Sequence, residues 1–303
     1  ANVHHPTLPR AGTESTGNNR LSDMKRGIIV PDFGEYSDPL LLAEMAHEAE
    51  EAGWDGFFVW DQISMNEVEP VCDVWIALAL IAQQTRHIKL GPMVTPIPRR
   101  RPTTLARQAV TLDHVSNGRL ILGVGLGAFQ YEEFEALGDE PDLKIRAEML
   151  DEGLEVLMGL WSGEQFAHEG KHYNIKTAQF LPKPVQQPHI PIWTAGVWPK
   201  KAPFRRAARW DGVMPGWDLF GDPTQSPQDV RDMIAFINSQ RISSETYDVA
   251  HGGRTTGTDH EADIQELSAY KEAGVTWWME DLNPWRGPLE EMRERIKNGI
   301  VHI

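Results

Sequence analysis

Residues 116–127 read SNGRLILGVGLG, and this stretch decides the fold. Asn117-Gly118 is a turn pair that ends the helical pattern before it. Leu120-Ile121-Leu122 is apolar at three consecutive positions, which is typical of a parallel strand buried on both faces. Three glycines then leave the end of that strand without bulky side chains.

The same unit repeats along the chain from Arg26 onward, because short apolar runs alternate with stretches of helical periodicity. The predicted strands are Gly27–Pro31, Gly56–Trp60, Ile88–Val94, Leu120–Gly125, Ile190–Ala195, Asp211–Met214, Tyr247–His251 and Val275–Met279. Eight strand–helix units in about 280 residues predict a (β/α)8 TIM barrel, which belongs to the α/β class. A doubly wound open sheet is the competing fold.

Helix start signals support this division of the chain. Asp38-Pro39 and Ser226-Pro227 each place a capping side chain before a proline, and Thr258 to Glu261 has capping-box spacing. The interval from Gly163 to Gln187 is too long for a simple crossover. We predict that it contains a small β-hairpin, inserted between the fourth helix and the fifth strand.

Composition and charge limit the function classes. Residues 1–23 are polar and predict a disordered N-terminal leader, and 24–303 predict a single barrel domain. The formal charge of −15 argues against nucleic acid and anionic membranes, which leaves a small molecule as the expected partner. Cys72 is the only cysteine, which suits a reducing, cytoplasmic compartment.

The glycines at 123, 125 and 127 formally satisfy a dinucleotide-binding pattern that ends in Ala128. Such a pattern belongs in a first strand–helix unit, whereas this one follows the fourth strand. Two interpretations stay open: the glycines let a flat ring approach the backbone, or they relieve crowding inside the barrel. Arg119, just before this strand, is expected to pair with a carboxylate at the bottom of the barrel.

Several linked motifs resemble the bacterial-luciferase-like superfamily of flavin- and deazaflavin-dependent oxidoreductases. They are Thr103–Ala109, Ser116–Arg119, Gly123–Gly127, Glu132–Gly138, Leu150–Leu154, Leu160–Gly163, Pro191–Gly196 and Ala207–Gly212. The resemblance implies a (β/α)8 barrel, usually dimeric, with the cofactor at the C-terminal ends of the strands. It implies FMN or a deazaflavin coenzyme, with NAD(P)H or a flavin reductase as a source of electrons.

The strand ends that face the barrel mouth supply the predicted cofactor-binding residues. They are Asp61, Met93, Thr95, Gly125, Gly127, Tyr131, Thr194, Ala195, Gly196, Val197, Trp198 and Gly216. The turn after the fifth strand opens onto a helix N-terminus beside Lys200 and Lys201, so we expect it to hold the flavin phosphate. Gly196→Trp is then expected to abolish cofactor retention without unfolding the barrel.

Three residues are candidates for catalytic roles: Gln62, His251 and Glu280. His251 ends the seventh strand, and an ordinary histidine titrates near neutrality. Its competing interpretation is a core histidine. Gln62 stands where deazaflavin enzymes of the superfamily frequently have histidine, which favours FMN. Tryptophans concentrate near the strand ends and predict a pocket for an apolar or aromatic substrate.

These observations predict an FMN-dependent monooxygenase that acts on a small organic substrate. The alternatives are a deazaflavin-dependent hydride-transfer enzyme of the same fold and a non-catalytic flavin-binding relative. A metal-dependent barrel hydrolase is disfavoured, because the first strand ends in Pro31-Asp32-Phe33 and offers no histidine pair as ligands. No metal site is expected.

Overall fold

The computed structural model describes residues 24–65, 69–216 and 225–299. The predicted leader therefore lies outside the described residues. Nine strands form one sheet in the order β3-β2-β1-β11-β10-β9-β8-β5-β4, and every recorded pairing within it is parallel. The strands are β1 Lys25–Val30, β2 Gly56–Val59, β3 Lys89–Pro92, β4 Thr95–Pro96, β5 Leu122–Gly125, β8 Ile192–Gly196, β9 Gly212–Pro215, β10 Asp248–Gly253 and β11 Trp277–Asp281.

The sheet closes into a barrel. β3 and β4 are two parts of one predicted strand, on either side of a cis peptide bond between Met93 and Val94. A parallel bridge between Leu90 and Leu120 joins β3 to the segment that leads into β5. All eight predicted strands are therefore present within a few residues of their expected bounds, and the open-sheet alternative is wrong.

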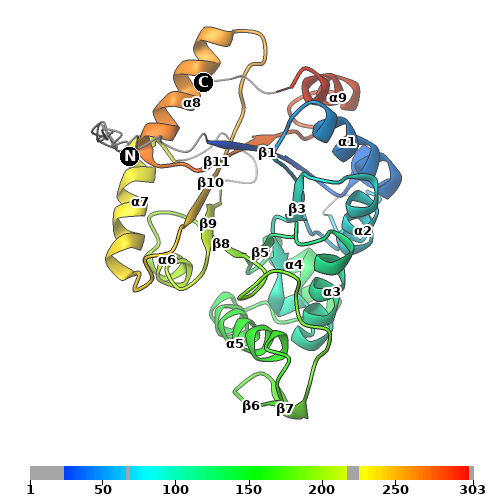
Figure 1. The fold of residues 1–303 in the computed structure, drawn as a ribbon, viewed down its shortest axis with the longest axis vertical. Helices are drawn as coiled ribbons and strands as arrows, with labels where there is room; N and C mark the ends of the chain where they lie inside the picture. Colours follow the sequence, from blue (N-terminus) through cyan, green and yellow to red (C-terminus); the bar gives the residue numbers. More distant parts are fainter. Residues whose placement is uncertain (1–23, 66–68, 217–224, 300–303) are drawn as a thin grey trace, which may run out of the picture.

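Helices surround the strands, as the (β/α)8 prediction requires (Figure 1). They are α1 Pro39–Glu51, α2 Val74–Gln84, α3 Pro102–Val115, α4 Gln130–Glu133, α5 Leu143–Trp161, α6 Lys201–Ala207, α7 Pro227–Gln240, α8 His260–Ala273 and α9 Leu289–Lys297, with short 3-10 helices at Gly34–Tyr36, Ile97–Arg99 and Glu135–Leu137. In the described part of the chain, no helix is both long and apolar enough to cross a membrane.

The helix caps follow the sequence signals with one exception. The Asp38 side chain accepts the Leu40 amide, and Ser226 forms a capping box with Asp229. At α8 the cap is Asp259, which accepts the Ala262 amide, and not the Thr258 of the predicted capping box. The Thr256 hydroxyl accepts hydrogen bonds from the backbone amides of Thr258 and Asp259. The hydrogen-bonded turn before α8 therefore begins at Thr256 and not at Thr258.

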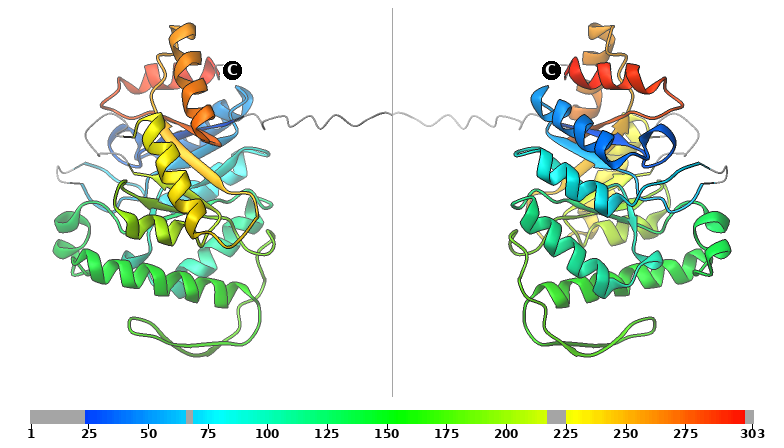
Figure 2. Two further views of the ribbon diagram at one scale, coloured as in Figure 1. Left: turned by 90° about the vertical axis from the view of Figure 1, so that its left-hand side faces the viewer. Right: turned by 90° about the vertical axis from the view of Figure 1, so that its right-hand side faces the viewer.

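An antiparallel hairpin lies between α5 and β8, where the sequence predicts an insertion. It consists of β6 Phe166–Glu169 and β7 Asn174–Ala178. Glu152 of α5 accepts the backbone amides of His172 and Tyr173, which fixes the hairpin on that helix. The hairpin lies at the opposite end of the molecule from α9 (Figure 2).

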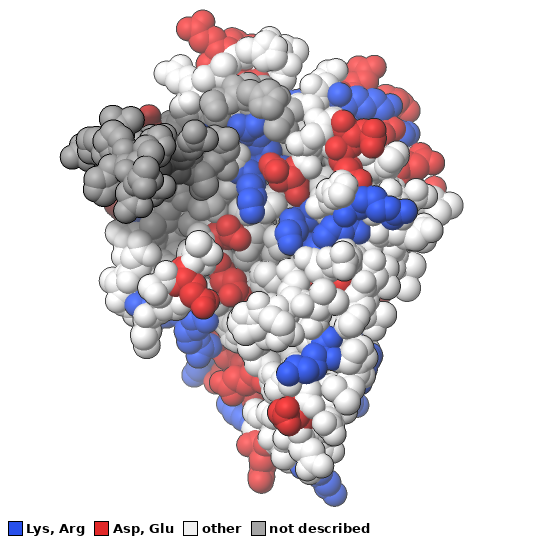
Figure 3. Space-filling view, viewed as in Figure 1, with Lys and Arg blue, Asp and Glu red and all other residues white. Residues whose placement is uncertain are grey.

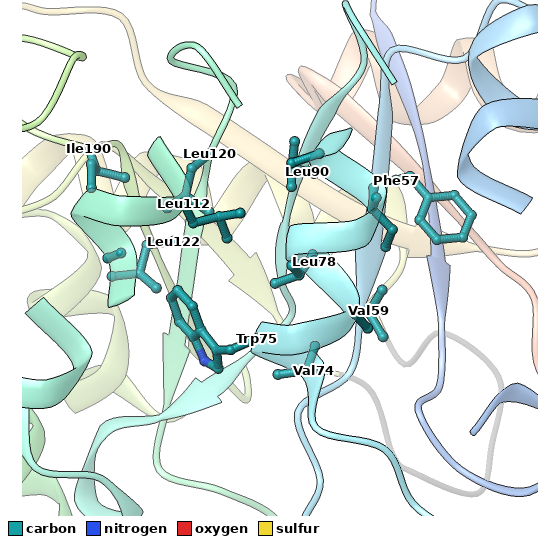
Figure 4. Close-up of a cluster of buried hydrophobic side chains, with 14 of the residues drawn as sticks. Phe57, Val59, Val74, Trp75, Leu78, Leu90, Leu112, Leu120, Leu122 and Ile190 are labelled. Carbon is teal, nitrogen blue, oxygen red and sulfur yellow. The ribbon is translucent and has the colours of Figure 1, made fainter. Parts of the chain in front are cut away.

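Alternate strand positions form two separate apolar layers. The outer cluster packs the strands on the helices, as Trp75, Leu78 and Leu112 do against Leu90 and Leu122 (Figure 4). The inner cluster fills the barrel and includes Ile29, Phe58, Trp60, Met93, Ile121, Trp193, Met214, Ala250, Trp277 and Met279. Side chains alternate along a strand. A residue next to a member of the inner cluster therefore faces outward, and a residue next to a member of the outer cluster faces inward.

Arg119 is buried, as its predicted structural role requires, but its predicted carboxylate partner is wrong. Its guanidinium donates to the backbone carbonyls of Ala82, Ile88 and Ser116 and to the Thr85 hydroxyl. Two of these acceptors, at Ala82 and Thr85, belong to the C-terminal end of α2, and Ser116 is the C-cap of α3. The last carbonyls of a helix have no partner within the helix, so those of Ala82 and Ser116 can accept from Arg119. On the face shown in Figure 3, acidic and basic side chains are interspersed and not segregated.

Candidate functional site

Small residues line part of the barrel interior at the C-terminal ends of β5 and β8. A Cβ on Gly125 would lie 2.6 Å from Val94 Cγ2 and 3.6 Å from the Cβ of Ala195. Gly123 differs, because a Cβ there would lie 2.3 Å from the Pro92 carbonyl oxygen. Crowding against the backbone accounts for Gly123, and crowding against the Val94 side chain also bears on Gly125. Gly125 and Ala195 together leave this part of the inner wall without long side chains.

Gln62 follows β2 and lies against a cavity of about 190 Å³. Its backbone amide donates to Asp32 Oδ2 at 2.9 Å, which fixes the start of the loop. The Gln62 side chain is buried, and its Oε1 atom has no hydrogen-bond partner among the described residues. A buried amide oxygen without a partner is costly unless a bound group satisfies it.

Asp61 is the centre of a buried charge network. Its two carboxylate oxygens accept from Arg99 Nη2 at 2.6 Å, from Arg100 Nη2 at 2.9 Å and from Thr95 Oγ1 at 2.6 Å. The side chains of both Arg99 and Asp61 are 2% exposed, and Arg99 also pairs with Glu133. Burial raises the pKa of Glu133, while Arg99 acts to lower it. Asp61 and Thr95, both predicted cofactor ligands, thus hold the ends of β2 and β4 together.

Asp32 also belongs to this region, although it is not among the residues predicted for the site. It follows β1 and is fully buried, and burial raises its pKa well above the ordinary value, against the Gln62 amide, which lowers it. Its Oδ1 atom has no partner in the described ranges. The available signal was its position, because a carboxylate directly after a barrel strand stands at the face where barrel sites form.

The side chains at the end of β8 face opposite sides of the sheet in turn. Ile192 belongs to the outer cluster and Trp193 to the inner one, so Thr194 and Gly196 face outward. A Cβ on Gly196 would lie 2.4 Å from Pro203 Cβ of α6. Gly196→Trp would therefore displace α6 from the barrel, and the expectation that this variant leaves the barrel intact is wrong.

Three other predicted cofactor residues differ in their surroundings. Trp198 packs between α6 and α7, where Lys201 Nζ lies 3.5 Å from the centre of its ring. Tyr131, on α4, is 62% exposed. Gly127 has a φ of +83°, and a Cβ there would strike Phe134. By contrast, Gly216 lies beside Val197, and its amide donates to the Gly196 carbonyl at 2.7 Å.

His251 is directed away from the mouth. It stacks on Tyr270 of α8 at 4.4 Å between ring centroids and contacts Trp278 at 6.0 Å, both members of a cluster behind the sheet. Neither ring nitrogen has a partner in the part of the chain that is described. Burial lowers the pKa of His251 to about 4. These surroundings are those of a core histidine.

This burial predicts a pH dependence of stability. The folded-state pKa of about 4 lies below the ordinary value of 6.5, so the unfolded chain binds the proton more readily. Well above pH 6.5, His251 therefore does not lower the free energy of unfolding. Acidification toward its folded-state pKa lowers that free energy by about 3 kcal/mol. His251→Phe keeps the stacking and should flatten the urea-unfolding profile between pH 7 and 4.5. A profile as steep as that of the wild type would contradict this assignment.

Glu280 likewise lies behind the strand end. It accepts from Arg286 Nη1, from Trp278 Nε1 and from the Thr255 hydroxyl, and it is 1% exposed. These bonds tie the loop after β10 to the loop after β11. Asp281, the next residue, shares the inner face with Met279 and pairs with Arg254.

Comparison with known proteins shows which family this chain matches and which relatives it resembles. Residues 25–298 match the family described as luciferase-like monooxygenase. A flavin-dependent trigonelline monooxygenase oxygenase component from Acinetobacter baylyi is 29% identical over 54% of this chain and 44% of its own length. An F420-dependent glucose-6-phosphate dehydrogenase from Amycolatopsis mediterranei is 32% identical over 62% of this chain and 58% of its own length.

The matches span about half the length of these relatives. Among solved structures, an F420-dependent secondary alcohol dehydrogenase in complex with an F420-acetone adduct superposes with a TM-score of 0.76. That match has 18% identity and covers 92% of this chain and 98% of the other, so it supports the fold alone. With the closed barrel and the family match over nearly all of the described residues, the chain belongs to the luciferase-like monooxygenase family.

Proposed function

We propose that this chain is an FMN-dependent monooxygenase that acts on a small organic substrate at the C-terminal mouth of the barrel. The buried Oε1 atom of Gln62, which has no partner among the described residues, is the observation that carries the proposal. An amide both accepts and donates hydrogen bonds, so it fits the alternating carbonyl and N–H groups on the polar edge of a flavin ring.

Gln62 lines its cavity together with residues that follow β2, precede or begin α2, or follow β4, namely Ile63, Val71, Cys72, Asp73, Val74, Arg99 and Arg100. On this proposal the flavin ring lies against the inner wall near the mouth, and its polar edge reaches Gln62. Gly125 and Ala195 leave the inner wall without long side chains, and Met93 and Val94 offer apolar contacts beside them. The Asp61 network holds the ends of β2 and β4 in place. The turn formed by Gly196, Val197 and Gly216 stays our predicted position for the phosphate.

When bound, FMN would supply the redox chemistry and the reaction with oxygen. This chain's own residues then have two tasks. Gln62 orients the ring edge, while Trp60 and Met93 keep water away from the reacting face. Reduced flavin would come from NAD(P)H or from a separate reductase, and we expect a homodimer in the cytoplasm.

FMN is favoured over a deazaflavin because no histidine stands at the mouth side of β2 or β10. Position 62 carries an amide that does not titrate, and His251 points behind the sheet. Deazaflavin-dependent hydride transfer is the second candidate. The F420-dependent relative and the F420-dependent structural neighbour support it.

Cofactor titration separates the two candidates. We expect the purified chain to bind FMN more tightly than coenzyme F420, as measured by fluorescence. Gln62→Leu should weaken FMN binding about tenfold, since it removes a buried hydrogen bond worth about 1.4 kcal/mol. Gln84→Leu, an exposed glutamine on α2, is the matched control and should bind FMN as the wild type does. Retention of F420 with no binding of FMN would replace the first candidate with the second.

A further inference from the structure

One large aromatic side chain at the rim of the barrel is exposed although it rests on buried rings. Trp285 is 53% exposed, whereas Phe33 and Trp60 beneath it are buried. The ring centroids lie 5.8 Å apart for Phe33 and Trp285, 6.1 Å for Trp60 and Trp285, and 6.0 Å for Phe33 and Trp60. We call these three residues the aromatic trio.

The trio stands at the C-terminal side of three neighbouring strands. Phe33 follows β1, Trp60 follows β2 directly, and Trp285 follows β11. β1 pairs with both β2 and β11, so these three strand ends are adjacent (Figure 1). Phe33 and Trp60 also belong to the inner cluster. The exposed face of Trp285 therefore borders the C-terminal mouth of the barrel.

A hydrogen-bonded chain fixes Trp285 relative to a cation. The Trp285 amide donates to Asn283 Oδ1 at 3.0 Å, and Asn283 Nδ2 donates to Asp281 Oδ2 at 2.7 Å. The same carboxylate oxygen accepts from Arg254 Nε at 3.0 Å and lies 2.9 Å from its Nη2. Asn283 and Asp281 are buried, so these bonds link the backbone at Trp285 to the Arg254 guanidinium through two buried side chains.

Arg254 has binding capacity left over. Asp281 occupies its Nε–Nη2 edge, and the side chain is 31% exposed. A guanidinium carries five N–H donors, and its end-on edge matches a carboxylate with two parallel hydrogen bonds.

We propose that Trp285 and Arg254 select the substrate, which is a planar aromatic ring that carries a carboxylate. The ring stacks on the exposed face of Trp285, and the carboxylate binds the open edge of Arg254. This assignment rests on the proposed function, because it places the substrate at the mouth where the flavin would lie. The local cation matters because the chain as a whole, at a charge of −15, repels anions.

Three probes test the assignment on the intact chain, with and without FMN: benzoate, benzyl alcohol and acetate, titrated by isothermal calorimetry. Benzoate combines the ring and the charge, and each of the others lacks one of them. We expect benzoate to bind at least about tenfold more tightly than either, because stacking and a bidentate pair each add to the affinity. Equal binding of the three probes would overturn the proposal.

Variants assign the two contacts separately. Trp285→Ala should weaken benzoate about tenfold, while Trp285→Phe should keep most of the affinity because a ring remains. Arg254→Gln should reduce benzoate to the level of benzyl alcohol and leave benzyl alcohol unchanged. Arg254→Lys keeps the charge beside Asp281 and so protects the fold, but it lacks the planar fork and should also lose most of the benzoate preference.

The matched control is Lys176→Gln, which removes one exposed charge from the hairpin at the far end of the molecule (Figure 2). It should bind all probes as the wild type does. Benzoate binding that is unchanged in Trp285→Ala would refute the stacking contact. A chain that binds FMN but does not prefer benzoate refutes this inference alone, whereas one that prefers benzoate but binds neither flavin refutes the proposed function alone.

Discussion

Replacement of Asp61 by alanine is expected to lower the free energy of unfolding by about 3–5 kcal/mol, because it removes the buried carboxylate that Arg99 and Arg100 share. Arg99 is 2% exposed and would keep only Glu133, while Arg100 would lose the carboxylate that it contacts through both oxygens. The Thr95 hydroxyl would lose its acceptor as well. Urea unfolding of the purified variant at pH 7 measures the change.

Two further variants show whether the charge or the packing is responsible. Asp61→Asn preserves the size of the side chain but not its charge. It should therefore recover only a small part of the free energy of unfolding that Asp61→Ala loses. Lys171→Ala removes an ion pair with Glu148 in which the two side chains are 69% and 36% exposed, and it should leave the free energy of unfolding close to that of the wild type because solvent screens exposed pairs. If Asp61→Ala unfolds at the same urea concentration as Lys171→Ala, the buried network does not stabilise the mouth.

Replacement of Gly91 by alanine should be about as severe, at about 4 kcal/mol or more. A Cβ on Gly91 would lie 1.8 Å from the backbone carbonyl oxygen of Ile121. Both residues flank the bridge between Leu90 and Leu120, where the barrel closes, so neither backbone can move without opening the sheet. We expect a lower thermal midpoint and a lower yield of folded protein.

Gly216→Ala is the matched control for this experiment. Among the described residues its added Cβ would meet nothing closer than 3.5 Å, so the stability should change by no more than about 0.5 kcal/mol. Equal melting temperatures for the wild type and Gly91→Ala would show that the barrel closes differently from the arrangement described here.

The strands could be predicted because parallel strands buried on both faces have apolar residues at consecutive positions. Gly27-Ile28-Ile29-Val30 and Leu120-Ile121-Leu122 show this pattern, and both become barrel strands or lead directly into one. The helix starts were equally local, since a capping side chain contacts amides only two or three residues away. Asp38 and Ser226 cap their helices as predicted.

The site residues were less predictable, because a strand end has two faces. Glu280 is the next-to-last residue of β11, whereas β10 continues two residues past the predicted end at His251, to Gly253. Both side chains point behind the sheet. Side chains alternate regularly along both strands, so a single position decides the face: Ala250 and Met279 belong to the inner cluster, and the residues next to them face outward. Asp281, one position beyond Glu280, is the carboxyl group on the inner face.

The sequence by itself determined the barrel, the positions of its strands and the family, because these depend on periodicity and on contacts between residues close along the chain. Only the tertiary structure decided which polar groups meet. Asp61 finds Arg99 and Arg100, Gln62 is left with a free oxygen, and Arg254 reaches Trp285 through Asp281 and Asn283. These contacts join segments that lie up to 39 residues apart, and their partners are selected by the closure of the barrel and not by any local pattern.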